Sequence, residues 1–101
     1  MEKSTKPLPS HLTDFLEWLE IEKGLSSKSQ ENYARFLKKF LDWLKINNLE
    51  DLKPHELTSE HIRQYRLFLA RQYLPKTKSS LKKSTQGYYL IALRSFLNYF
   101  A

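Results

Sequence analysis

The chain has 101 residues, which is enough for one domain with a modest core. Its 41% hydrophobic and 14% aromatic content is typical of a packed globule, and the lack of cysteine excludes disulfides, thiolate zinc sites and a cysteine nucleophile. The net charge of +6 favours an anionic partner. No apolar run approaches the ~20 residues that a membrane span needs. We therefore expect a cytosolic or nucleoid-associated protein without membrane contact.

Apolar residues recur at helical spacing along most of the chain, and no stretch alternates with period two, which predicts an all-α fold. Residues 1–9 contain two prolines and are expected to form a flexible leader before a single domain at 10–101. Ser10 is a suitable N-cap for a first helix, and Gly24 stands where a left-handed residue can end it. The predicted buried face of this helix is Leu12, Phe15, Leu16 and Leu19.

A second helix is expected from Ser27, which has capping-box spacing to Gln30, to about Ile46. Its core stripe is Tyr33, Leu37, Phe40, Leu41 and Leu44. Pro54 interrupts the connector that follows, and Thr58 is the predicted N-cap of a third helix. The predicted buried face of the third helix is Ile62, Tyr65, Leu69 and Tyr73.

A loop at 74–83 with Pro and Lys precedes a fourth helix, whose start is expected between Lys82 and Thr85. Its apolar stripe is Tyr89, Leu93, Phe96 and Phe100. No Gly, Pro or basic turn ends this helix, so we expect the domain to belong to a longer protein.

Basic and acidic residues are sorted along the sequence. From His61 onwards there are eight Lys and Arg and no Asp or Glu, whereas the first sixty residues hold nine basic against eleven acidic side chains. The C-terminal part therefore carries a charge of +8 and the rest −2. A face that binds a phosphate backbone gains from such sorting, because each neutralised phosphate releases condensed counterions.

Two surfaces are candidate DNA contacts. On the second helix Lys28, Asn32, Arg35 and Lys39 form one stripe opposite the core, without an acidic residue in it. The second surface is the start of the fourth helix, where free N–H groups and the positive dipole end favour anions. Its candidate residues are Lys82, Lys83, Ser84, Thr85, Gln86, the outward-pointing Tyr88 and Arg94, with Lys76 and Lys78 in the loop. Ile91 is also expected on the outer face of this helix. For each surface the alternative is an ordinary solvated helix face.

Catalytic and cofactor motifs are missing from the sequence. His11, His55 and His61 do not have metal-ligand spacing, and there is no Gly-rich phosphate loop and no His-Glu-x-x-His. We therefore expect no catalytic residue, no metal site and no cofactor in this chain.

Three segments in a fixed order carry a family resemblance. The first runs from Phe15-Leu16-Glu17-Trp18-Leu19 through Glu22-Lys23-Gly24-Leu25-Ser26 to Lys28-Ser29, Tyr33, Leu37 and Phe40-Leu41. The second is Leu52 and Leu57-Thr58 with Ile62, and the third is Leu81, Thr85 and Leu90 with Ala92-Leu93-Arg94-Ser95-Phe96-Leu97 and Tyr99. Together they resemble the N-terminal core-binding domain of tyrosine recombinases (the phage integrase family), Xer-like members especially. The resemblance implies a four-helix, SAM-like bundle that clamps one side of a recombination half-site on double-stranded DNA.

The resemblance also implies partners and site residues. A separate C-terminal catalytic domain of the same parent chain is expected to close on the other side of the DNA, with other recombinase protomers bound nearby. In such domains the second and fourth helices face the DNA, and the motif places Lys28, Ser29 and Tyr33 on the second helix and Thr85 and Arg94 on the fourth. The tyrosine nucleophile belongs to the catalytic domain, so none of the six tyrosines here is assigned that role.

A function from another class stays open at this point. A helical protein-interaction module of the death-domain or SAM type would also be all-α, and its basic face would meet an acidic partner. Salt-dependent binding to duplex DNA would separate the two functions.

Overall fold

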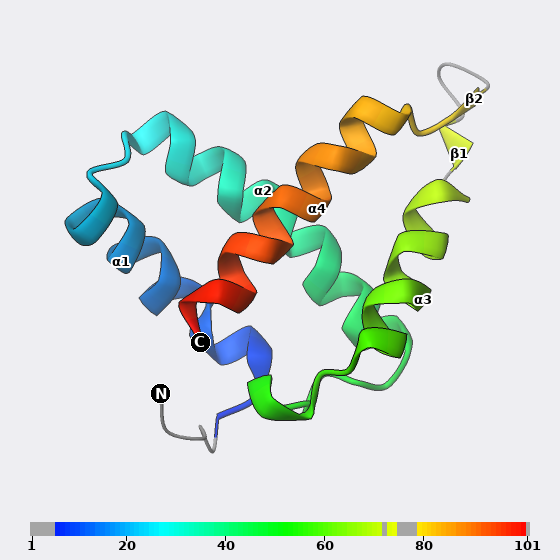
Figure 1. Cartoon of the computed structure of the whole chain (residues 1–101), viewed down its shortest axis with the longest axis horizontal. Helices are drawn as coiled ribbons and strands as arrows, with labels where there is room; N and C mark the ends of the chain where they lie inside the picture. Colours follow the sequence, from blue (N-terminus) through cyan, green and yellow to red (C-terminus); the bar gives the residue numbers. More distant parts are fainter. Residues whose placement is uncertain (1–5, 72, 75–78, 101) are drawn as a thin grey trace.

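Four α-helices make up most of the described part of the chain, which comprises residues 6–71, 73–74 and 79–100 of a computed structural model (Figure 1). The helices are α1 (Leu12–Lys23), α2 (Ser27–Ile46), α3 (Ser59–Ala70) and α4 (Lys83–Tyr99), with short 3-10 turns at Leu8–His11 and Pro54–Glu56. The helices α2 and α4 cross near the centre, α1 packs against α2, and α3 packs against α4. The all-α prediction is therefore confirmed. None of these helices is both long enough and apolar enough to cross a membrane.

One hydrophobic core lies between the four helices, and aromatic rings connect them. The Phe40 ring of α2 meets the Tyr65 ring of α3 edge-to-face at 5.0 Å, and Phe15 of α1 meets Phe96 of α4 at 5.2 Å. Such edge-to-face pairs add to the free energy gained from apolar burial. The buried core residues are Leu8, Phe15, Leu19, Leu37, Phe40, Trp43, Leu44, Tyr65, Leu69, Ala92, Leu93 and Phe96.

Local signals at helix ends explain most of the boundaries. Thr58 caps α3 as predicted: its Oγ1 accepts from the His61 N–H, and the Thr58 N–H donates to His61 Nδ1. Gly24 ends α1 in the left-handed conformation, at φ 62°. The α2 cap is one residue earlier than predicted, because the Ser26 Oγ, and not that of Ser27, accepts from a first-turn N–H.

The N-terminal boundary of the domain differs from the expected leader. Leu8 is fully buried in the core, and its N–H donates to the Leu52 carbonyl at 2.8 Å, so residues that we assigned to the leader belong to the packed structure. Ser10 is also not the N-cap of α1: it lies inside the 3-10 turn, and His11 occupies the cap position without a side-chain cap bond. Burial of Leu8 outweighs the local preference for a Ser cap.

The end of α3 also differs from the prediction. The helix ends at Ala70, and Tyr73, which we placed on its buried face, belongs to a two-residue strand β1 (Tyr73–Leu74). This strand pairs antiparallel with β2 (Ser79–Ser80), with Tyr73 opposite Ser80. The loop expected at 74–83 therefore contains a short strand pair, and Lys76 and Lys78 lie outside the described residues.

Tyr65 brings an unsatisfied polar atom into the core. The side chain is fully buried, and its hydroxyl has no hydrogen-bond partner among the residues that the structure describes. Burial, and secondarily the nearby Tyr89, raise the pKa of the Tyr65 hydroxyl above its ordinary value of 10.0. The raised pKa means that the folded state disfavours the phenolate. Stability from the protonated hydroxyl is thus fully present below pH 10.0 and is lost as the pH rises above it.

We predict that Tyr65→Phe raises the free energy of unfolding by about 1 kcal/mol, because it removes a buried hydroxyl that no partner satisfies. The variant should also lose less stability than the wild type above pH 10.0. Chemical denaturation at neutral and alkaline pH measures both effects. Tyr88→Phe is the control, since Tyr88 is 57% exposed and the change should be nearly neutral. A less stable Tyr65→Phe protein would mean that the hydroxyl has a stabilising partner.

Candidate nucleic-acid interface

The predicted stripe on α2 lies on one side of the helix, but its four residues differ in how far they reach into solvent. Lys28 and Arg35 are exposed, whereas Asn32 and Lys39 are partly buried. The Arg35 guanidinium carbon lies 5.0 Å from the Phe36 ring centroid, and the Lys39 ammonium lies 5.5 Å from that of Phe68 on α3. These cation–π contacts hold the charges along apolar surface at the edges of α2.

The start of α4 is open to solvent. Lys82 occupies the N-cap without a side-chain cap bond, and Lys83 and Ser84 in the first turn are exposed. Thr85 is partly buried. The first N–H groups of a helix have no intrahelical acceptor, so this end combines N–H donors with two lysines. Arg94 is exposed further along the same helix.

The helices α2 and α4 begin with the same local device, which the sequence analysis missed. Gln30 Nε2 donates to the Leu25 carbonyl at 3.1 Å, and Gln86 Nε2 donates to the Leu81 carbonyl at 2.8 Å. The pattern Leu-x-x-x-x-Gln-x-x-Tyr at 25–33 and 81–89 is the signal that could have identified it. The Gln86 amide, which we predicted to face a base edge or phosphate, thus holds the start of its own helix.

A basic groove between α3 and α4 was also missed. It has a volume of 510 Å³, and its wall includes Arg63, Arg66, Lys83 and Gly87. Arg66 and Arg94 line a second, adjoining groove of 390 Å³ between the same helices. The lack of acidic residues after Glu60 indicated a basic surface in this part of the chain. The sequence did not show, however, that α3 would place its arginines beside α4.

Glu60 pairs with Arg63, one of the residues that line this basic groove. Its carboxylate forms a salt bridge with Arg63 at 2.9 Å. Hydrogen bonds from Arg63 and then Gln64 lower the pKa of Glu60 from its ordinary value of 4.5 to about 2, so the carboxylate is charged at neutral pH. Both side chains are 60% exposed, and the salt bridge therefore contributes little to stability. Its main effect is to reduce the positive charge at Arg63.

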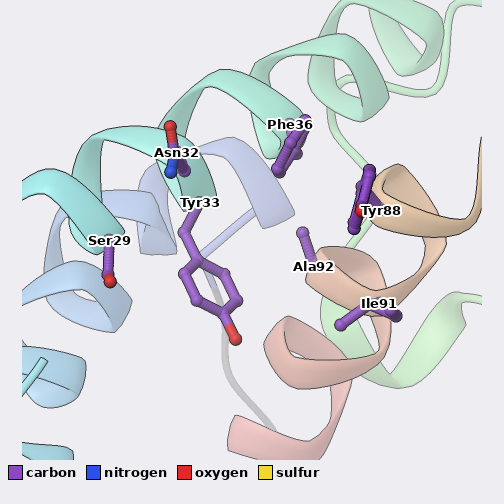
Figure 2. Close-up of a pocket in the computed structure, with 7 residues that line it drawn as sticks. All are labelled: Ser29, Asn32, Tyr33, Phe36, Tyr88, Ile91 and Ala92. Carbon is purple, nitrogen blue, oxygen red and sulfur yellow. The ribbon is translucent and has the colours of Figure 1, made fainter. Parts of the chain in front are cut away.

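A smaller groove separates α2 from α4 (Figure 2). We call it the central groove; it has a volume of 190 Å³ and is lined by Ser29, Asn32, Tyr33, Phe36, Tyr88, Ile91 and Ala92. Tyr88 and Ile91 are 57% and 55% exposed, in agreement with the predicted outward direction of both side chains. The Tyr88 and Phe36 rings lie parallel to within 16°, with centroids 6.2 Å apart.

The described residues contain no group of three or more His, Cys, Asp or Glu side chains that could hold a metal ion. For binding, this part of the chain offers exposed cations, helix N-termini and a partly apolar groove.

Comparison with known proteins gives two matches. Residues 12–101 match the model of the family described as phage integrase, N-terminal SAM-like domain. Over 80 residues the chain is 32% identical to the tyrosine recombinase XerD of Corynebacterium glutamicum, an alignment that covers 79% of this chain and 25% of the relative. The match thus spans about a quarter of the relative's length. No solved structure matches significantly.

We predict that Gln86→Ala lowers the free energy of unfolding by about 1 kcal/mol, because it removes the bond to the Leu81 carbonyl. Gln30→Ala should have a similar effect through Leu25. Thermal unfolding measures both, with Ser84→Ala as an exposed control close to Gln86. Unchanged stability in both glutamine variants would show that these bonds do not hold the helix starts.

Proposed function

The chain belongs to the phage integrase N-terminal SAM-like domain family, and from this membership we propose that it binds duplex DNA as the core-binding domain of a tyrosine recombinase. In this role it clamps one side of a recombination half-site. The observation that carries the proposal is a basic surface on α2 and α4, with the helix N-terminus of α4 beside Lys82 and Lys83.

The physical support comes from the placement of charge on the fold. Exposed cations lie on both crossing helices, and the groove between α3 and α4 adds Arg63 and Arg66. Cations spread over neighbouring helices can neutralise several phosphates at once, which is the main source of affinity in sequence-tolerant DNA binding. An acidic protein partner, the alternative function, would use the same charges but would not require them to follow a duplex.

The remaining parts of the recombination reaction are proposed to lie outside this chain. The matched relative is named a tyrosine recombinase, and this chain aligns with a quarter of it. We propose that strand cleavage belongs to a C-terminal catalytic domain of the parent protein, that other protomers bind the same DNA, and that the protein works at the nucleoid. No residue of this chain is assigned to the cleavage step.

We predict salt-dependent binding to duplex DNA. If about four to six phosphates are neutralised, the logarithm of the binding constant should fall with the logarithm of the salt concentration at a slope of about −4 to −5. Fluorescence anisotropy with a labelled duplex at several salt concentrations measures the slope. A slope near zero, or no binding at low salt, contradicts the proposed function.

The loss of DNA binding on removing a cation should depend on the side of the molecule on which that cation lies. The triple change Lys28→Ala, Arg35→Ala and Lys39→Ala is expected to weaken binding and reduce the salt slope. Stability should change by less than about 0.5 kcal/mol at each of the exposed sites Lys28 and Arg35, and by somewhat more at Lys39, which is partly buried over the Phe68 ring. Lys45→Ala with Lys53→Ala is the control, since neither residue belongs to the stripe. Equal losses in both variants would indicate general charge attraction in place of a defined face.

Gly87 gives a sharper test of the α4 surface. It lines the groove between α3 and α4, and a β-carbon built on it has no neighbour within 4 Å, so larger side chains fit. We predict that Gly87→Glu greatly weakens DNA binding, because it adds a carboxylate beside the phosphates, while helix propensity rises and the fold is kept.

Gly87→Gln separates charge from size in the same experiment, because it adds nearly the same bulk without the carboxylate. It should bind DNA more tightly than the Glu variant, and both should unfold at or above the wild-type temperature. If Gly87→Glu binds DNA like the wild type, this face of α4 does not contact the duplex.

A further inference from the structure

The exposed sides of α2 and α4 share one order of side chains. On α2, Asn32 lies between the cations Lys28 and Arg35; on α4, Tyr88 and Ile91 lie between Lys83 and Arg94. The neutral residues in the middle line the central groove, and the four cations do not. On each helix, cations suited to phosphates therefore flank neutral side chains of a different chemistry.

The apolar part of the central groove is not explained by phosphate binding. Phe36, Ile91 and Ala92 line it, and the Tyr88 ring lies along that of Phe36 while it remains 57% exposed (Figure 2). Ile91 is likewise 55% exposed. Apolar side chains that stay exposed next to a groove indicate a ligand with apolar surface of its own. Along a DNA duplex, the thymine methyl group is the apolar feature of the major groove.

The polar part of the groove points to the same base pair. Asn32 lines the groove, and its side-chain amide makes no hydrogen bond to a described residue. An amide offers one donor and one acceptor side by side, which matches the N6 and N7 atoms of adenine. Guanine presents two acceptors and is bound by Arg or Lys, and none of the described residues that line this groove is a cation.

We propose that the central groove reads A·T base pairs in the major groove, with Tyr88 and Ile91 against thymine methyl groups and Asn32 paired with adenine. This inference rests on the proposed DNA binding and adds to it a site of sequence preference. The cations that flank the groove on both helices hold the backbone, and the groove between them contacts the base edges.

Chemically altered duplexes test the site directly. The probes are a short duplex of alternating adenine and thymine, the same duplex with deoxyuridine in place of thymidine, and one with 7-deazaadenine in place of adenine. Deoxyuridine lacks only the methyl group, so binding should weaken about fourfold for each methyl that the groove covers. The 7-deazaadenine duplex lacks the N7 acceptor and should bind roughly tenfold more weakly.

Variants then assign each effect to a side chain. In Ile91→Ala the preference for thymidine over deoxyuridine should fall towards one, and in Asn32→Ala the duplexes with adenine and 7-deazaadenine should bind equally. Ile21→Ala is the matched control: Ile21 is an isoleucine of α1 that is 75% exposed and does not line the groove, so both preferences should stay at the wild-type value.

The outcomes separate this inference from the proposed function. If the wild type binds all three duplexes equally and with the expected salt dependence, DNA binding stands and the A·T site is wrong. If preferences exist but Ile91→Ala and Asn32→Ala keep them, the site lies elsewhere and the inference is also wrong. If no duplex binds at low salt, the proposed function itself fails, and the groove is then better suited to a protein segment.

Discussion

The crossing of α2 over α4 determines most of what the molecule presents to a partner. Ala92 is buried at this crossing, and its small side chain lets the two helix backbones approach. On α2, the Phe36 ring packs edge-to-face against Tyr89 at 5.0 Å. The two helices diverge from the crossing, so that the N-terminal half of α2 lies at the upper left of Figure 1 and that of α4 at the upper right. A larger residue at position 92 would separate the helices and disturb every cation placed by them.

The helix packing explains how the separation of acidic and basic residues along the sequence produces one basic region of the surface. Glu60 is the last acidic residue of the chain, and its salt bridge to Arg63 places it at the edge of the basic groove between α3 and α4. After Glu60, every Asp, Glu, Lys or Arg position in the sequence is a Lys or an Arg. Since α3 packs beside α4, the arginines of α3 extend the basic surface sideways and do not form a separate one. The described cations of α3 and α4 that follow Glu60 therefore share one region of the surface.

Sequence analysis succeeded where the determining contacts are local. Thr58 was identified as a cap because its bonds reach only three residues along the chain, and the outward directions of Tyr88 and Ile91 followed from helical periodicity. The analysis failed where distant contacts decide. Nothing near Leu8 indicates that its N–H would pair with Leu52, and this contact moved the domain boundary. Helical periodicity likewise predicted that α3 extends to Tyr73, although the helix ends at Ala70.

At the candidate site, too, local features were predicted from the sequence and contacts between distant segments were not. Periodicity placed Lys28, Asn32 and Arg35 on one side of α2, but only the packed structure shows that Asn32 turns to a groove shared with α4 while the cations flank it. For Gln86, composition suggested a DNA contact, whereas the bond to Leu81 gives it the role that Gln30 has at the start of α2. The repeated hydrogen bond ties each helix start to the residue before its N-cap, and neither helix has an acidic residue in its first turn. Two helix N-termini fixed in this way keep their positive dipole ends uncompensated by carboxylates, which suits a surface that meets an anionic backbone.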